Sequence, residues 1–496
     1  MDTHKEAILC IAERVRSFHI RDEPFRLYHG STNSTRHSDR NVDNVVDTSG
    51  LKNILEVDKG KKTVLVESNV TMEALVDATL PHGLVPLVVM EFPAITVGGG
   101  FSGTSGESSS FRYGAFDATI NWIEIILADG TVSNASKYDR QDLFWGAASG
   151  FGTLGVVTLL EVQLKDAKTF VELTYKVVWG FPEAVETIKK ECEKDENDYI
   201  DGIVYSKDTA VMCIGRLVDR VPAAAIPRQL SRRKDEWFYL HVEKVQDDLR
   251  KGSVVCVIDY IPLRDYLFRY DRGGFWVAKY AFQYFITPFN RVTRYILDPL
   301  LRARVMYSAG HKSKLFDYYM VQDVGVPYSH ALEFHNWLDN RFGIYPIWIC
   351  PLRVQRDEPN SNHGLHADFG KPGAVDYLNF GIWGPLRGNR RDAIEHNRAL
   401  ERKVGVYGGK KWLYAQAYYT KDEFWSLYDK KSYDELRKKY GASGLPSVYE
   451  KVKVDIEGHE GVMRSTAKTR WPLRGLHGVC KAVFRGDYLL QKNTNK

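Results

Sequence analysis

The chain has 496 residues, more than one hydrophobic core usually supports, so two domains are expected. Apolar residues make up 44% of the chain and charged residues 26%, and the net charge of +5 gives no indication of nucleic-acid binding. The six cysteines form no CxxC pair, which favours free thiols in a reducing compartment over disulfides. His363 and His366 share the segment HGLH, but Pro359 and Gly364 predict a loop there, so no metal site is expected.

The first residues predict a helix rather than a targeting signal. Thr3 and Glu6 form a capping-box pattern, and apolar side chains follow at helical spacing at positions 8, 11, 15 and 18. Charges interrupt every apolar run, which excludes a secretory signal peptide. Because no segment has the roughly 18 charge-free apolar residues that a membrane span requires, no transmembrane anchor is expected.

The next segments predict short strands separated by polar loops. Strands are expected at residues 25–28, 44–46, 54–57, 63–67 and 84–89, with a helix over residues 71–82. Residues 30–35 (GSTNST) follow the first strand. Their backbone N–H groups and hydroxyls form a turn of the kind that can wrap a pyrophosphate.

Residues 96–114 (TVGGGFSGTSGESSSFRYG) combine glycine with small hydroxyl residues. Such a backbone can approach a ligand closely and keeps many N–H donors free, although a flexible surface loop has the same composition. The flanks favour the wall of a ligand site, because Phe92-Pro93 stiffens the entry and residues 121–128 predict a strand that ends at Asp129-Gly130. A further glycine-rich passage, residues 142–157, ends in another predicted strand.

These loops contain neither a GxGxxG nor a GxxxxGK[ST] fingerprint between strand and helix, so neither a Rossmann fold nor a P-loop is supported. Instead, FRLYHGSTNSTR, PAITVGGGFSGTSGESSSFRYG, ILADG and DLFWGAASGFGTLGVVT occur in an order and spacing that resemble the FAD-binding domain of the vanillyl-alcohol oxidase superfamily. The resemblance implies a PCMH-type domain in which an extended FAD lies between two small α+β subdomains.

The resemblance also implies which residues hold FAD. The turn after Tyr28 would bind the diphosphate, and the flavin ring would lie toward the second half of residues 96–114 and the loop at 152–155. Many relatives attach FAD through a histidine where this chain has Asn33, so non-covalent FAD is expected, with His29 as the alternative tether. The expected FAD contacts are Tyr28, His29, Gly30, Ser31, Thr32, Asn33, Ser34, Thr96, Val97, Gly98, Gly99, Gly103, Thr104, Gly106, Ser109, Ser110, Tyr113, Gly114, Gly152, Thr153, Gly155 and Val156.

From residue 167 onward, predicted strands alternate with charged helices, which indicates an α+β cap with helices on one side of a sheet. We therefore predict an α+β protein made of an FAD-binding domain (1–166), a cap or substrate domain (167–410) and a C-terminal segment (411–496) that returns toward the flavin and ends in a disordered tail. Residues 275–289 (FWVAKYAFQYFITPF) are aromatic and short, which favours a core helix or a cavity wall over contact with a membrane interface.

Several phrases of the second half narrow the resemblance. DRGGFW, MVQDVGVPYSHALEF, YPIWICPLR and the long segment that starts KWLYAQAYYT at residue 411 closely resemble the Δ24-sterol reductase family, which uses FAD and NADPH to saturate a side-chain alkene. The resemblance implies an apolar small-molecule substrate, peripheral membrane contact, and a location in the cytoplasm or at the endoplasmic reticulum membrane. Two positions depart from it, because Asn379 and Gln416 stand where a carboxylate is expected.

Reduction of an isolated alkene requires an acid that protonates one carbon, and an apolar site without competing water. The candidate acids are Tyr418, Glu107, Tyr414, Asp323 and Glu423, of which Tyr418 and Glu107 stand first because each lies inside a family phrase. A buried tyrosine also commonly serves only as a hydrogen-bonding anchor. The alternatives are an FAD-dependent oxidase of an alcohol or hydroxy acid, and a flavin-binding protein without turnover.

Overall fold

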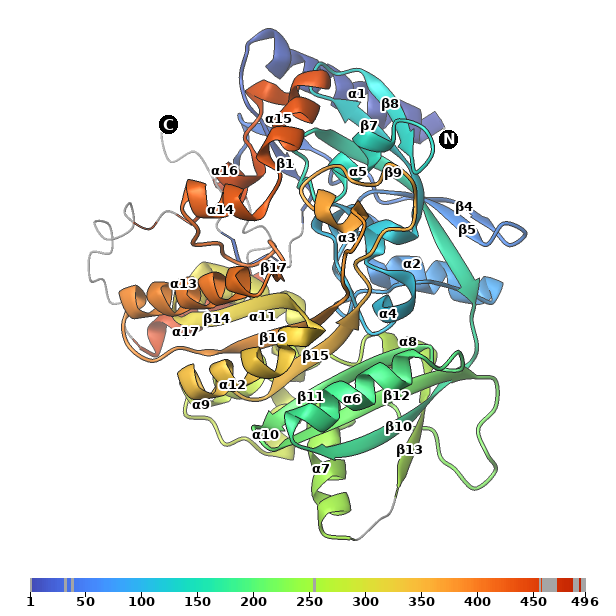
Figure 1. The fold of residues 1–496 in the computed structure, drawn as a ribbon, viewed down its shortest axis with the longest axis vertical. Coiled ribbons are helices and arrows are strands. Elements are labelled where there is room, and N and C mark those ends of the chain that lie inside the picture. Colours follow the sequence, from blue (N-terminus) through green and yellow to red (C-terminus); the bar gives the residue numbers. More distant parts are fainter. Residues whose placement is uncertain are drawn as a thin grey trace.

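The computed structural model describes residues 2–30, 34–36, 40–252, 256–454, 456, 471–484 and 490–491. Helices and sheets are both present throughout, so the predicted α+β class is confirmed. Figure 1 shows the N-terminal region at the top and the cap below it, with the C-terminal helices α14, α15 and α16 beside the N-terminal region.

The N-terminal region begins with a helix that packs on a sheet. The side chains of Ile8, Ile11, Val15 and Phe18 are buried, as their spacing predicted. The predicted strands and the helix after them are also present. The elements are α1 (Asp2–Ile20), β1 (Arg26–Tyr28), β2 (Arg40–Asn41), β3 (Val45–Asp47), β4 (Ile54–Asp58), β5 (Thr63–Glu67), α2 (Met72–Thr79), β6 (Leu84–Pro86), α3 (Val97–Gly103), α4 (Ser110–Tyr113), β7 (Ile120–Leu127), β8 (Val132–Ser136), α5 (Gln141–Ala147) and β9 (Gly155–Asp166).

The strands of this region form a sheet in the order β4-β5-β9-β7-β8, with β6 paired to β9. The long strand β9 is central, because it pairs antiparallel with β5, β6 and β7. After β9 the chain passes to β10, which belongs to a different sheet. We therefore propose that the FAD-binding domain ends at residue 166.

The cap is built on an antiparallel sheet in the order β13-β10-β12-β11-β15-β16-β14-β17. Along each strand, alternate side chains face opposite sides of the sheet. The elements are β10 (Phe170–Trp179), α6 (Phe181–Cys192), β11 (Tyr199–Ser206), β12 (Thr209–Val218), α7 (Phe238–Arg250), β13 (Val257–Pro262), α8 (Leu263–Leu267), α9 (Val277–Tyr284), α10 (Arg291–Leu297), α11 (Ala303–Ser313), β14 (Tyr319–Pro327), α12 (Ala331–Arg341), β15 (Ile347–Leu352), β16 (Tyr377–Pro385), α13 (Arg390–Val406) and β17 (Lys410–Lys411).

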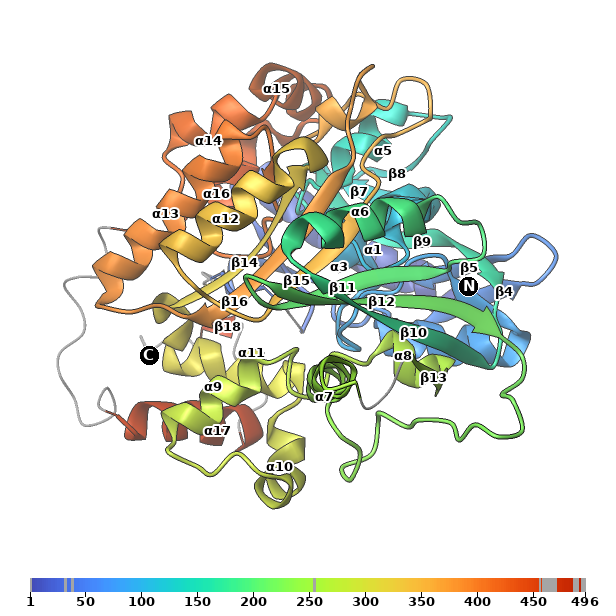
Figure 2. The ribbon, with the colours of Figure 1, turned by 60° about the horizontal axis from the view of Figure 1, so that its bottom comes forward.

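The cap sheet carries helices on both faces, so the expectation of helices on one side was wrong. Figure 2 shows α6, α12 and α13 above the sheet and α7, α9, α10 and α11 below it. Phe181, Phe334 and Phe380 belong to the core on the first side. On the second side, Trp237 and Trp276 join a core that continues into the N-terminal region. The sheet needs both layers because both of its faces are apolar.

The C-terminal segment contains α14 (Lys421–Leu427), α15 (Lys430–Lys439), α16 (Val448–Val452), α17 (Leu473–Phe484) and β18 (Leu490–Gln491). Leu436 and Leu445 pack with Ile11 and Val15 of α1, which returns the segment to the N-terminal region. Within the predicted disordered tail, residues 473–484 form α17; residues 457–470, 485–489 and 492–496 lie outside the described residues. No helix in the described part of the chain is long and apolar enough to span a membrane.

Candidate functional site

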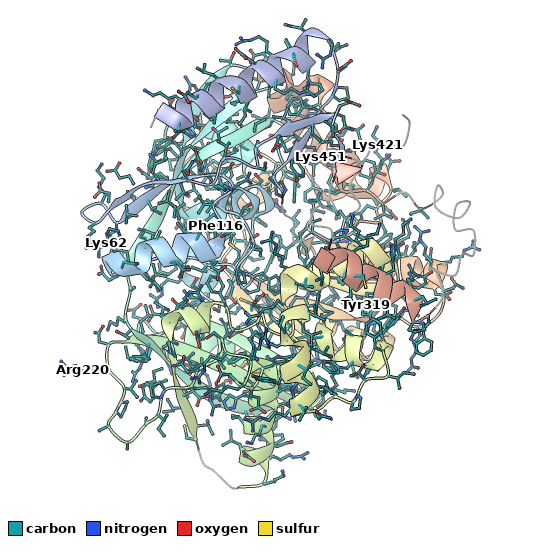
Figure 3. All side chains as sticks on the ribbon, turned by 180° about the vertical axis from the view of Figure 1, so that it is seen from behind. Lys62, Phe116, Arg220, Tyr319, Lys421 and Lys451 are labelled. Carbon is teal, nitrogen blue, oxygen red and sulfur yellow. The ribbon has the colours of Figure 1, made fainter. Side chains whose placement is uncertain are left out.

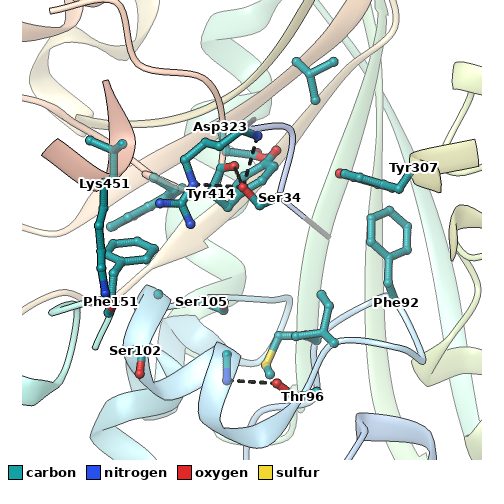
Figure 4. A pocket seen from close by; sticks show the side chains of 18 of the residues that line it. Ser34, Phe92, Thr96, Ser102, Ser105, Phe151, Tyr307, Asp323, Tyr414 and Lys451 are labelled. Atoms are coloured by element: carbon teal, nitrogen blue, oxygen red, sulfur yellow. Dashed lines mark hydrogen bonds between the residues drawn. The ribbon is translucent and has the colours of Figure 1, made fainter. Parts of the chain in front are cut away.

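A cavity of about 980 Å³ lies where the N-terminal region, the cap and the C-terminal segment meet. Figure 4 shows its main walls: Thr96, Ser102 and Ser105 lie on one side, and Asp323 and Tyr414 lie across from them. Phe151 and Lys451 stand at one end, and Phe92 and Tyr307 stand at the other. The cavity is therefore elongated and has chemically different ends.

The side that α3 forms is made mainly of backbone. Gly98, Gly99, Gly103 and Gly106 all line the cavity, and the Thr96 hydroxyl caps α3 by accepting a hydrogen bond from the Gly99 N–H at 3.1 Å. A Cβ at Gly103 would meet no atom nearer than 3.8 Å, which is an ordinary van der Waals contact, so the backbone there is not crowded by other side chains. A bound molecule can therefore come close to this backbone.

The end of the cavity near Lys451 is polar and basic. Arg36, Lys421, Lys451 and Lys453 line it, and Figure 3 shows Lys421 and Lys451 close together on the C-terminal helices. The Lys451 ammonium donates hydrogen bonds to the Phe151 carbonyl at 2.9 Å and to the Gly152 carbonyl at 3.2 Å, which joins α16 to the glycine-rich passage at residues 142–157. This concentration of positive charge suits an anionic group such as a diphosphate.

The opposite end is aromatic. Phe275 packs on Trp383 with ring centroids 4.2 Å apart, on Trp348 at 5.5 Å and on Phe92 at 5.8 Å. All four rings line the cavity together with Tyr307. Residues 275–289 therefore contribute a core helix and part of the cavity wall, as their composition favoured. Such a surface accepts an apolar ligand.

Asp323 faces the cavity from β14 and is held by two donors. Its Oδ2 accepts a hydrogen bond from the Tyr414 hydroxyl at 2.5 Å, and its Oδ1 accepts one from the Asn379 amide at 2.9 Å. Asn379 in turn accepts from the Trp412 indole N–H at 2.8 Å. Burial raises the pKa of Asp323 to about 6, and the hydrogen bonds from Tyr414 and Asn379 oppose that rise. At neutral pH Asp323 is mainly ionised.

Glu91 is a second carboxyl in the cavity wall, just before the Phe92-Pro93 pair. Burial raises its pKa to about 8, with further contributions from the negative charges of Glu107 and Asp323. At neutral pH Glu91 therefore carries its proton while Asp323 does not. Two carboxyl groups with separated pKa values allow one to act as an acid and the other as a fixed negative charge.

A buried ionic cluster behind the cavity wall connects the two halves of the molecule. Arg269, 1% exposed, lies 2.9 Å from the Asp201 carboxylate and 3.4 Å from that of Glu107. Asp201 also accepts from the Tyr270 hydroxyl at 2.6 Å and from the Trp348 indole N–H at 2.9 Å. Trp348 lines the cavity, so the cluster fixes the orientation of one of its aromatic walls.

Eleven of the 27 residues expected from the sequence line this cavity. They are His29, Ser34, Thr96, Gly98, Gly99, Gly103, Gly106, Gly152, Val156, Asp323 and Tyr414. The others lie outside its wall: Tyr28, Gly30, Val97, Thr104, Ser109, Ser110, Tyr113, Gly114, Thr153, Gly155, Glu107, Tyr418 and Glu423. Ser31, Thr32 and Asn33 fall outside the described residues.

The candidate acids outside the wall have structural partners. Glu107 belongs to the Arg269 cluster, and the Tyr418 hydroxyl donates to the Gln416 side chain at 2.7 Å. Glu423 completes the capping box of α14 with Thr420 and lies 3.0 Å from Arg398. Residues that sequence reasoning overlooked as acids or cavity walls include Glu91, Phe92 and Tyr307. Glu91 had a detectable signal, because it is the only charged residue between positions 83 and 98.

The residues present fit an FAD molecule. The glycine backbone beside α3, the basic end near Lys451 and the hydroxyls of Ser102 and Ser105 offer the donors that a long molecule with a diphosphate and a polar ring system needs. Among the described residues, no group of three or more His, Cys, Asp or Glu side chains is arranged to hold a metal ion.

Comparison with known proteins gives matches of different extent. A family model described as an FAD binding domain matches residues 9–136. The Delta(24)-sterol reductases of Homo sapiens and Arabidopsis thaliana are each 31% identical to this chain, over 407 and 448 residues, and the alignments cover 81% and 82% of this chain and 76% of each relative. Cytokinin dehydrogenase 4 of Oryza sativa is 30% identical over 135 residues, which is 27% of this chain and 26% of that protein.

Proposed function

Since the chain belongs to the Δ24-sterol reductase family and is an FAD-dependent oxidoreductase acting on a carbon–carbon double bond, we propose that it reduces a side-chain alkene of a sterol-like or other prenyl-tailed lipid, with NADPH as the reductant. The resemblance predicted from the sequence is thereby confirmed. The proposal is carried by one observation: two carboxyl groups, Glu91 and Asp323, line the same cavity as the aromatic rings of Phe275, Trp348 and Trp383.

We propose Glu91 as the proton donor and Asp323 as the counter-charge. An isolated trisubstituted alkene accepts hydride poorly until its less substituted carbon is protonated, and the tertiary carbon then carries positive charge. Glu91 has a proton to give at neutral pH, and ionised Asp323 stabilises the positive charge together with the faces of Trp348 and Trp383. When bound and reduced by NADPH, the flavin would supply the hydride.

We propose supporting rather than chemical roles for the remaining candidate residues. Tyr414 donates to Asp323 and, because burial raises its pKa well above the usual value, it keeps its proton and orients that carboxylate. Asn379 donates to the other oxygen of Asp323, so an amide at this position favours the ionised form. We propose structural roles for Glu107, Tyr418 and Glu423.

The reaction is tested by following the flavin spectrum without oxygen. We expect NADPH to bleach the flavin and a prenyl-tailed lipid to restore its colour. An oxidase of hydroxylated substrates would instead be reduced by its substrate, without NADPH, and reoxidised by oxygen. A flavin that neither NADPH nor any substrate bleaches would indicate a binding protein without turnover.

The rate of alkene reduction is predicted to depend on pH in a bell shape. Protonated Glu91 is lost as the pH rises through about 8, and ionised Asp323 is lost as the pH falls through about 6, so the maximum is expected between these values. Glu91→Gln should lower the rate of flavin reoxidation by alkene about 10²- to 10⁴-fold and remove the alkaline limb. An unchanged rate in this variant would exclude Glu91 as the donor.

FAD retention is predicted to depend on the open backbone at Gly103. Gly103→Phe should sharply reduce the FAD content of the purified protein, because the ring would occupy the space beside α3. Gly50→Phe is the control, since a Cβ at Gly50 likewise meets no clash but Gly50 does not line the cavity. Denaturation of the unaltered protein should release FAD, as expected for non-covalent binding, and full FAD content in Gly103→Phe would place the cofactor elsewhere.

A further inference from the structure

The turn that carries Phe275 has an unusual backbone. Gly273, Gly274 and Phe275 have φ values of 87°, 49° and 57°, so three consecutive residues lie in the left-handed region. Glycine adopts a positive φ freely, but for a residue with a bulky side chain this conformation is strained. Gly274 and Phe275 both line the cavity, so the strain lies at the ligand site. Backbone strain often gathers at such sites, where it serves a function.

The strained turn is held in place by its neighbours. The Phe275 N–H donates a hydrogen bond to the Tyr270 carbonyl at 3.0 Å, and the Gly274 N–H donates one to the Asp271 carbonyl at 3.2 Å. The Asp271 side chain in turn lies 3.1 Å from the guanidinium of Arg302, just before α11. A strained residue persists only where the surrounding structure fixes it in this way.

The ring of Phe275 stands at the centre of the aromatic end. It lies between the ring of Tyr270, stacked with centroids 4.0 Å apart and planes 18° apart, and the ring of Trp383 at 4.2 Å. It also contacts the rings of Phe92 and Trp348. Phe92, Trp348 and Trp383 line the cavity, whereas Tyr270 does not line it and is 1% exposed. The Phe275 ring therefore closes the cavity toward the aromatic core behind it.

The closing ring is joined by short chains of contacts to the two carboxyl groups proposed for the chemistry. On one side, Glu91 immediately precedes Phe92, and both line the cavity. On the other side, the Trp383 indole N–H donates to the Tyr414 hydroxyl at 3.3 Å, and this hydroxyl donates to Asp323. An alkene placed between these carboxyl groups therefore has little room beyond its double bond before the tail meets the closing ring.

We propose that Phe275 determines specificity by limiting how far a substrate tail extends beyond the reacting double bond. Alkenes close to the end of a tail then fit, and alkenes that carry a longer group past the reacting carbons are excluded. The turn holds the ring in this position although its backbone conformation is unfavourable for phenylalanine. The inference rests on the proposed function for the position of the double bond, whereas the strain and the closure of the cavity do not depend on turnover.

The strain is tested by the order of stability within two pairs of variants. Alanine is ordinarily more favourable than glycine, but at a positive φ the order reverses. In chemical denaturation of the FAD-loaded protein, Phe275→Gly should therefore be more stable than Phe275→Ala, by about fivefold in the equilibrium constant for unfolding. Phe92 is the matched control, because it lines the same cavity without a positive φ. Phe92→Gly should be less stable than Phe92→Ala, and the same order at position 275 would overturn the proposal.

The limit on the tail is tested with two prenyl-tailed alkenes that differ only beyond the double bond. One ends in two methyl groups, and in the other a butyl group replaces one methyl. In the unaltered protein the first should reoxidise the NADPH-reduced flavin about 100-fold faster than the second, and in Phe275→Gly this preference should fall to about tenfold or less. Phe275→Leu, which removes only part of the side chain, should give an intermediate preference.

The same preference in the unaltered protein and in both Phe275 variants would contradict the proposal. A preference that is lost in Phe92→Ala but kept in Phe275→Gly would assign the limit to Phe92 instead.

Benzene provides a test that needs no turnover. Removal of the Phe275 ring leaves an apolar space, and spaces of this kind bind benzene. Benzene should therefore raise the denaturation midpoint of FAD-loaded Phe275→Gly more than that of the unaltered protein, and it should restore the preference of this variant for the shorter alkene. If no alkene reoxidises the flavin, the proposed function fails, while the order of stability and the effect of benzene still decide the role of Phe275. Equal effects of benzene on both proteins would then count against that role.

Discussion

Asp323→Asn is expected to slow alkene reduction by about 10²- to 10³-fold while FAD remains bound, because it removes the negative charge that faces the developing cation. Asparagine has nearly the same shape, and its side-chain oxygen can still accept a hydrogen bond from Tyr414. The measurement is the rate at which substrate reoxidises the NADPH-reduced flavin without oxygen. The acid limb of the pH profile, near pH 6, should disappear with the carboxylate.

Two other variants serve as controls, because they remove polar groups that lie outside the cavity wall. Tyr418→Phe takes away a hydroxyl that donates to Gln416, and Glu423→Gln changes a capping residue of α14. Both should retain rates close to that of the unaltered protein. A large loss in Tyr418→Phe together with a normal rate in Asp323→Asn would move the chemistry toward Gln416 and contradict the assignment of Asp323.

The sequence predicted those parts of the site whose residues lie close together in the chain. The glycines and hydroxyls of residues 96–106, together with their flanking segments, predicted a ligand-binding backbone, and seven of these residues line the cavity. The order of the glycine-rich loops then indicated the class of cofactor. Asp323 and Tyr414 were also candidates, but 91 positions separate them, and the sequence did not show that they share a hydrogen bond.

The direction in which each side chain points could not be predicted from the sequence. Tyr414 and Tyr418 stand four positions apart in one phrase, yet only Tyr414 reaches the cavity, because residues 412–419 form neither a helix nor a strand whose period would set the direction. The raised pKa of Glu91 could not be predicted from the sequence for a different reason. Its raised pKa comes from burial and from Glu107 and Asp323, and the latter is brought close only by the cap. The second helical layer of the cap could not be predicted for the same reason, because the sheet face that it covers packs against segments that are distant in the chain.

Arg269→Met is expected to lower the free energy of unfolding by about 3–5 kcal/mol, because it leaves two buried carboxylates without their cation. Arg269 lies between Asp201 of the cap and Glu107 of the N-terminal region, and both carboxylates are almost fully buried. Arg264→Met is the matched control. Its partially exposed guanidinium pairs with Glu73 and Asp77 at the surface, so that loss should stay within about 1 kcal/mol. Chemical denaturation followed by circular dichroism measures both.

The pH dependence of the Arg269→Met variant separates the loss of charge from a loss of packing. Burial already raises the pKa of Glu107 in the folded protein, and Arg269 opposes that rise; without the guanidinium the folded-state pKa of Glu107 should rise further above its unfolded value, so the folded protein binds more protons. The penalty should therefore be small at acidic pH and grow as the pH rises through the unfolded pKa values near 4. Adding Glu107→Gln to Arg269→Met removes one uncompensated charge and should recover part of the stability at neutral pH. A penalty that is the same at every pH would assign the effect to the aromatic rings of Tyr266 and Tyr270, over which the Arg269 guanidinium lies at 4.1 and 4.6 Å.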